Sequence, residues 1–162
     1  MSNNQELITK TILDTYLSAE LNALKTPAGW FGSLDETVAE FTTSSTSFGA
    51  VSASFLTATI TTGGGDVLVG FTGTCRASGN LVAYFDILLD GVQVGGEDGL
   101  VAQNVATSTE NNISLVARIG AGALSAGSHS FALAYKTSAN TLTLRAGFSA
   151  SQVHSIYWGV EL

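Results

Sequence analysis

The stretch Leu124-Ser-Ala-Gly-Ser-His-Ser-Phe-Ala-Leu-Ala-Tyr135 decides the fold, together with the final segment Ser155-Ile-Tyr-Trp-Gly-Val-Glu-Leu162. Polar and apolar residues alternate over residues 128–137, 141–148 and 154–162. Because successive side chains of a strand face opposite sides of its sheet, this period of two predicts three strands. We expect them to close a small β-sandwich.

The same period of two runs through the middle of the chain. The dipeptide Asp90-Gly91 is a strong signal for a two-residue hairpin turn. Further strands are predicted over residues 52–60, 67–75, 81–89, 92–95 and 113–119, with a short one around 100–103 inside the long loop 96–112. About eight strands without alternating helices predict an all-β, jelly-roll-like antiparallel sandwich and exclude a parallel α/β fold.

Residues 5–24 are predicted to form an amphipathic helix that precedes the sandwich. Asn4 can cap its start, and Pro27 ends the pattern. The helix is either a lid on the sandwich or an arm that docks on another subunit, and we favour the arm. Its apolar residues recur every three or four positions and are Ile8, Ile12, Leu13, Tyr16, Leu17, Leu21 and Leu24.

A domain boundary is expected near residue 46, where the pattern changes. Residues 1–46 are interpreted as the helical arm and an irregular linker, and residues 47–162 as the jelly-roll domain. Trp30 and Phe31 lie in this linker and anchor it either to the core or to a neighbouring subunit.

Composition narrows the range of partners. The 162 residues are 45% hydrophobic and only 12% charged, with a net charge of −7. So acidic a chain, without a Lys/Arg patch, is not expected to bind nucleic acid. No apolar run is long enough for a membrane span or a signal peptide. Either partners cover part of the surface, or the exterior is coated with Ser and Thr; both explanations stay open.

No catalytic or metal site is predicted. His129 and His154 are the only histidines, and neither has a second ligand at a metal-binding spacing. No Gly-x-Ser-x-Gly motif is present, so we expect no enzyme and no cofactor. Cys75 is expected in the core, and Gly63-Gly-Gly65 is expected to be a turn. Of the adjacent Tyr157 and Trp158, one should be buried and the other displayed.

A possible ligand loop is the second candidate site. Asp86, Asp90, Glu97 and Asp98 are the densest acidic group of the chain. Glu97 and Asp98 could hold Ca²⁺, although a solvated loop explains them better because their spacing matches no calcium loop. Asn111 and Asn112 close the same loop.

The string from Leu124 to Leu133, then a Thr/Leu strand, then a strand ending Val160-Glu-Leu162, resembles the last strands of jelly-roll domains in tailed-bacteriophage structural proteins. Their layout is similar to that of tumour-necrosis-factor-like and complement-type heads. The segment Leu17-Ser-Ala-Glu-Leu-Asn-Ala-Leu24 also resembles the short helix that opens many phage head and tail proteins. The resemblance implies a virion building block made in the host cytoplasm.

Three functions are compatible with the sequence. The leading hypothesis is a capsid decoration or cement protein that forms a homotrimer and binds the major capsid protein or other virion proteins. The second is a fibre or spike head that binds host glycans through the loop 96–112. The third, a hydrolase, would need His129 or His154 and lacks a nucleophile motif.

Overall fold

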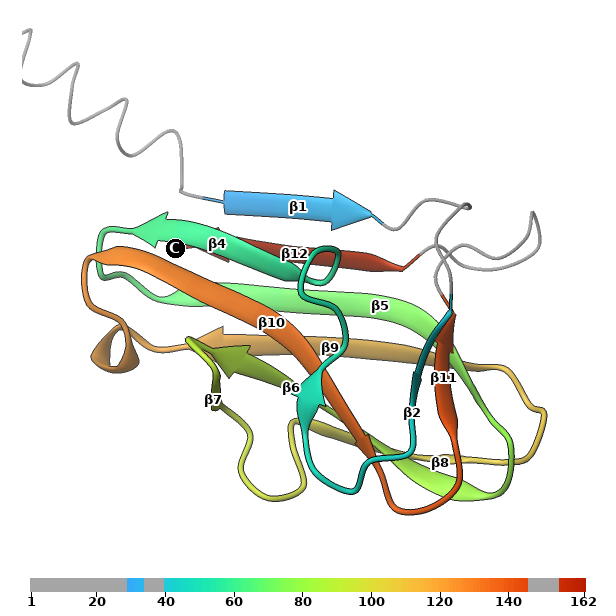
Figure 1. Ribbon diagram of the computed structural model, residues 1–162. Helices are drawn as coiled ribbons and strands as arrows, with labels where there is room; N and C mark the ends of the chain where they lie inside the picture. The colour runs from blue at the N-terminus through green and yellow to red at the C-terminus, as the bar shows by residue number, and fades with distance from the viewer. Residues whose placement is uncertain (1–28, 34–39, 146–154) are drawn as a thin grey trace, which may run out of the picture.

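A computed structural model describes residues 29–33, 40–145 and 155–162. Within these ranges the chain is all-β apart from one short 3-10 turn, η1 (Figure 1). The elements are β1 (Gly29–Ser33), β2 (Phe41–Thr43), β3 (Gly49–Ala50), β4 (Thr57–Thr62), β5 (Val67–Ala77), β6 (Leu81–Leu89), β7 (Val92–Gln93), β8 (Val101–Val105), β9 (Asn111–Ile119), η1 (Ala121–Ala123), β10 (Gly127–Thr137), β11 (Leu142–Arg145) and β12 (Ile156–Glu161). The predicted helix at residues 5–24 lies outside the described residues.

Short strands share positions in the sheets. Strands β11 and β12 pair with successive parts of the same edge of β5, and β1 and β2 continue that arrangement outward. In the same way β3 and β4 share one edge of β10, while β7 and β8 share one edge of β6. Four pairs of the twelve described strands each share one position, so the two sheets together have eight positions.

Two antiparallel sheets face each other. We write two strands that share a position with a slash between them. The order of positions is β1/β2, β12/β11, β5, β9 in sheet 1 and β3/β4, β10, β6, β7/β8 in sheet 2. The chain changes sheet at six of the eleven connections between the described strands, and the other five join strands of one sheet, among them the β6–β7 hairpin. Such repeated crossing between two sheets is typical of a jelly roll. The predicted jelly-roll sandwich of about eight strands is confirmed.

The predicted irregular linker is wrong for two of its segments. Gly29–Ser33 pairs with β12 across five residues, and Phe41–Thr43 pairs with β11, so both are strands of sheet 1. Their partners lie 99–131 residues away in sequence, which is why local composition did not reveal them. The strand predicted over 52–60 begins only at Thr57, because the Ser52 hydroxyl accepts N–H bonds of a turn at Ser54 and Phe55.

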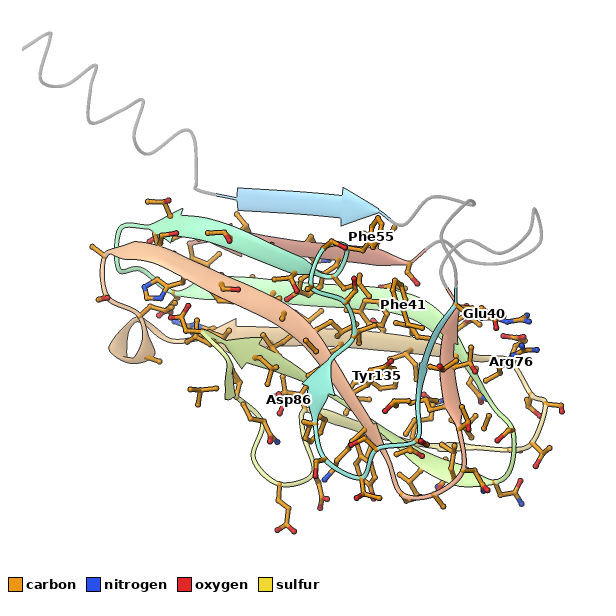
Figure 2. All side chains as sticks on the ribbon, viewed as in Figure 1. Glu40, Phe41, Phe55, Arg76, Asp86 and Tyr135 are labelled. Atoms are coloured by element: carbon orange, nitrogen blue, oxygen red, sulfur yellow. The ribbon has the colours of Figure 1, made fainter. Side chains whose placement is uncertain are left out.

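The core lies between the sheets and follows the predicted alternation. Along β9, Ile113, Leu115, Ala117 and Ile119 are buried, while the residues between them face solvent. Phe71 of sheet 1 packs on Phe85 of sheet 2 with ring centroids 6.3 Å apart. Side chains from both sheets fill this layer (Figure 2).

Two predictions about single core residues are confirmed. Cys75 is fully buried. Tyr157 is also buried, whereas Trp158 faces outward and is partly exposed. The β6–β7 turn is the predicted hairpin, and both Asp90 (φ 50°) and Gly91 (φ 82°) adopt the left-handed backbone that such a turn requires.

The glycine turn between β4 and β5 binds a carboxylate of the same chain. The backbone N–H of Gly63 donates to both carboxylate oxygens of Glu161, at 2.7 and 3.0 Å, and that of Gly65 donates at 2.8 Å. Successive N–H groups of a turn form such an anion-binding concavity. The last strand is thereby tied to the β4–β5 turn.

Candidate docking face

The outer side of sheet 1 carries an apolar surface that no described residue covers. Because residues directly opposite in register share a side, neighbouring strands place their outward side chains together. Val116 is 63% exposed, and the other apolar side chains on this side are partly exposed. We call this surface the apolar face; its members are Leu68, Val116, Ile156, Trp158 and Val160.

A glycine creates the centre of the apolar face. Gly70 stands between Trp158 on β12 and Val116 on β9. A Cβ placed on Gly70 would lie 2.3–2.6 Å from three atoms of the indole ring. The indole therefore lies flat across the backbone of β5, where any other residue would lift it. One flat side of the indole ring therefore forms part of the outer surface of the sheet.

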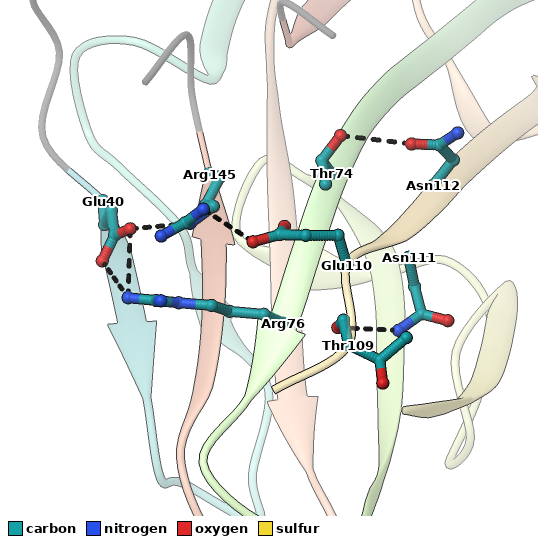
Figure 3. A network of polar contacts seen from close by, with 8 residues as sticks. All are labelled: Glu40, Thr74, Arg76, Thr109, Glu110, Asn111, Asn112 and Arg145. Atoms are coloured by element: carbon teal, nitrogen blue, oxygen red, sulfur yellow. Dashed lines mark hydrogen bonds and ion pairs between the residues drawn. The ribbon is translucent and has the colours of Figure 1, made fainter. Parts of the chain in front are cut away.

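A network of ion pairs, drawn in Figure 3, lies next to one end of the apolar face in the strand register. The Arg145 guanidinium donates through Nε to Glu40 at 2.8 Å and through Nη1 to Glu110 at 2.6 Å. Arg76 Nη2 donates to the same Glu40 carboxylate at 3.1 Å. The network links the segment before β2 with β11, β5 and the segment before β9. It holds four neighbouring positions of sheet 1 in one arrangement.

The charged side chains described around the apolar face form ion pairs that balance one another. Arg118 pairs with Asp66 at the other end, so all three arginines of the chain lie on this side of the sandwich with carboxylate partners. Among the described residues, the three arginines balance Asp66, Glu40 and Glu110 on this side, although the whole chain carries −7. Two copies of so acidic a protein repel each other least where neutral surfaces meet. The apolar face is therefore suited to self-association.

The predicted docking residues are placed only in part. The seven apolar residues of the helix, from Ile8 to Leu24, lie outside the described residues. Trp30 and Phe31 belong to β1, where Phe31 stands opposite Trp158 in the register. This places the backbone of β1 beside the apolar face rather than in a separate linker.

The four residues of the predicted ligand loop fall into two pairs with different contact partners. Asn111 bonds to Gln103 and Thr109, and Asn112 accepts from Thr74. Glu97 and Asp98 contact a different residue, Lys136. In the described part of the chain, no three His, Cys, Asp or Glu side chains gather where they could hold a metal ion.

The segment that carries Glu97 and Asp98 is held at its start by a hydrogen bond to a buried carboxylate. The buried Asp86 carboxylate accepts N–H bonds from Ile87 at 2.7 Å and from Gly95 at 3.0 Å. Burial raises the pKa of Asp86, and these two N–H bonds oppose that rise. Lys136 Nζ lies 4.8 Å from the ring centroids of both Phe48 and Tyr84.

The described residues offer little for catalysis. Burial raises the pKa of the Cys75 thiol to about 12, so it is no nucleophile near neutral pH. His129 bonds to Asp90, but the second ring nitrogen is occupied by a backbone carbonyl. His154 lies outside the described residues. In the described part of the chain, no helix is long and apolar enough to cross a membrane.

Sequence reasoning missed the features that unite distant segments. The Arg145–Glu40–Arg76 network and the bond from Glu161 to the glycine turn join residues 36–105 positions apart. The sequence did contain one signal for the apolar face: the residue types at the positions of each predicted strand that face away from the core. Val116 breaks the polar set of β9, and Gly70 lies among the outward positions of β5.

Comparison with known proteins identifies no family. No protein-family model matches the chain, and neither does any curated protein. Among solved structures, a chain of infectious bursal disease virus Gt strain matches 83% of this chain and 33% of its own length, with a TM-score of 0.51 and 15% identity. The present chain therefore spans one third of that viral chain.

Two further matches have lower scores. Eiger TNF from S. frugiperda matches 84% of this chain and 92% of its own length, with a TM-score of 0.49 and 14% identity. Particles derived from infectious bursal virus match 83% of this chain and 36% of theirs, with a TM-score of 0.46 and 17% identity. At such identities, the likeness to the bursal disease virus chain shows a shared fold: this chain is a jelly roll similar to one found in a virus.

Proposed function

We propose that the chain is a virion structural protein that decorates and cements a bacteriophage capsid as a homotrimer. The observation that carries the proposal is the apolar face, whose central Val116 is 63% exposed and whose bordering charges cancel. Exposed apolar patches of this kind mark protein interfaces. The shared fold with a viral chain is compatible with this role.

The mechanism requires binding only. Three copies bury the apolar face against one another about a threefold axis. The predicted helical arm at residues 5–24 then binds the major capsid protein. A protein that binds the assembled shell and not its separated subunits stabilises the shell by its binding free energy.

A pair of valine substitutions tests the trimer. Val116→Asp places a charge in the apolar face, and we expect it to convert the trimer to monomers in native mass spectrometry. Val92→Asp is the matched control, because Val92 is 70% exposed but lies on the β6–β7 hairpin. A trimeric Val116→Asp variant, or a monomeric wild-type protein, would contradict the proposed interface.

Truncation tests the arm separately. A chain lacking residues 5–24 should remain a soluble trimer and lose its binding to capsids in co-sedimentation. Tight capsid binding by the truncated trimer would rule out the arm as the attachment. A glycan array addresses the fibre-head alternative, since a cement protein should give no saccharide signal.

A further inference from the structure

His129 joins two separate segments at one end of the sandwich. It lies near the start of β10, where β9 ends and the β6–β7 hairpin turns (Figure 1). Its ring nitrogen Nδ1 is 2.7 Å from Asp90 Oδ2 of the hairpin. Its other ring nitrogen, Nε2, is 2.9 Å from the carbonyl oxygen of Ser125 in the β9–β10 connection. The imidazole is only 12% exposed.

Both partners of His129 accept hydrogen bonds and neither can donate one. A neutral imidazole has a single N–H, so it would leave one nitrogen lone pair facing an oxygen. The imidazolium has two N–H groups and satisfies both contacts. Asp90 is itself fixed, because its other oxygen accepts the Ser130 N–H at 2.8 Å. The geometry therefore fits the charged ring.

Asp90 is the charged group that dominates the surroundings of His129. Strand β4, which pairs with β10 here, and the connection 120–127 contain no titratable residue. The hairpin also carries Asp86, whose carboxylate bonds to Ile87 and Gly95. From sheet 1, Asp66 and Arg118 pair with each other, and Glu161 bonds to the glycine turn.

The hydrogen bonds of this cluster shift two pKa values in opposite directions. The bond to Asp90 and then the bond to Ser125 raise the pKa of His129. The bond to His129 and then the Ser130 N–H lower the pKa of Asp90. Both shifts favour the ion pair.

The same two segments form the walls of a cavity of about 520 Å³. One wall is the hairpin, with Leu89, Val92 and Val94, and the other is the end of β9 and the connection, with Ile119 and Ala123. We propose that protonated His129 is a latch that holds these walls together, and that loss of its proton releases the connection and opens the cavity. The Thr62 hydroxyl also donates to the Ser125 carbonyl, at 3.1 Å, but it contacts only the connection; no other group described at this end bonds to both walls.

The pH range of the latch follows from the signs of the two shifts. Because the pKa of His129 is raised in the latched state, its stabilisation is complete below the ordinary histidine value of about 6.5. It is lost as the pH rises through the raised value. Because the pKa of Asp90 is lowered, its contribution is present above about 3.9 and is lost only as the pH falls through the lowered value.

Hydrogen exchange of the full chain tests the latch. Amide protection factors of residues 120–127 should fall by up to about tenfold per pH unit between pH 6.5 and the raised pKa of His129, and then stay constant. Fluorescence of the apolar dye anilinonaphthalene sulfonate should rise over the same range. His129→Gln should show the open level at every pH. The control Asp98→Asn, which changes an exposed carboxylate, should behave as wild type.

Ring ¹⁵N chemical shifts of wild-type His129 provide a readout that needs no variant. We expect two protonated ring nitrogens at pH 6.5 and a titration midpoint that falls in Asp90→Asn. A singly protonated ring at pH 6, or protection of residues 120–127 that does not change with pH, would overturn the proposal.

Discussion

Replacing Gly70 with alanine should lift the Trp158 indole off sheet 1. The added Cβ would lie 2.3 Å from Cε2 and 2.4 Å from Cζ2 of the ring. Carbon atoms prefer a separation of about 3.5–4.0 Å, so the ring must move outward by more than about 1 Å. Overpacking of this kind costs about 1–3 kcal/mol. We expect Gly70→Ala to lower the free energy of unfolding by that amount.

Urea unfolding at one fixed protein concentration measures this loss, since association would otherwise change the apparent stability. Trp158 emission, followed in a Trp30→Phe background, should shift to longer wavelength as the ring gains solvent. Gly49→Ala is the matched control, because a Cβ there meets no atom within 4 Å.

A double variant isolates the cause. In a Trp158→Ala background, Gly70→Ala should cost nothing, because the clashing ring is absent. Equal stability of Gly70→Ala and Gly49→Ala, with unchanged Trp158 emission, would refute the packing of the indole on Gly70.

Two further outcomes are expected from residues in sheet 1. Glu161→Ala removes the acceptor of three N–H contacts from Gly63 and Gly65. It should cost about 1.5–3 kcal/mol in urea unfolding, as is typical of hydrogen bonds to a charged group; full stability of this variant would mean that water replaces the carboxylate at no cost. Cys75, buried and with a pKa raised to about 12, should react with a thiol reagent only at the rate of unfolding, and rapid labelling of the folded protein at pH 8 would contradict its placement in the core.

The central strands could be predicted because their signal is local. In β9 every second residue enters the core, and the Asp90-Gly91 turn fixes the β6–β7 hairpin by its own backbone preference. Strands β1 and β2 could not be predicted in this way. They are three to five residues long and exist as strands because β12 and β11 offer them an edge.

The candidate site was predicted less well than the fold, for the same reason. Trp158 was correctly expected to lie opposite to Tyr157, since adjacent residues of a strand face opposite sides. That Trp158 lies on Gly70, 88 positions earlier, depends on the register between β12 and β5. His129 was recognised as a residue near a strand start, but its bond to Asp90 also depends on pairing between distant strands.

The position of β11 and β12 has a consequence for synthesis of the chain. These strands come last in the sequence, yet they lie between β1/β2 and β5 in sheet 1. On a ribosome, the first two strands emerge without a partner, and one edge of β5 stays open until residues 142–161 have emerged. Open edges of this kind make nascent β-proteins prone to aggregate. Sheet 1 is therefore completed only after residues 142–161 have emerged, when β11 and β12 pair between β5 and the two earliest strands.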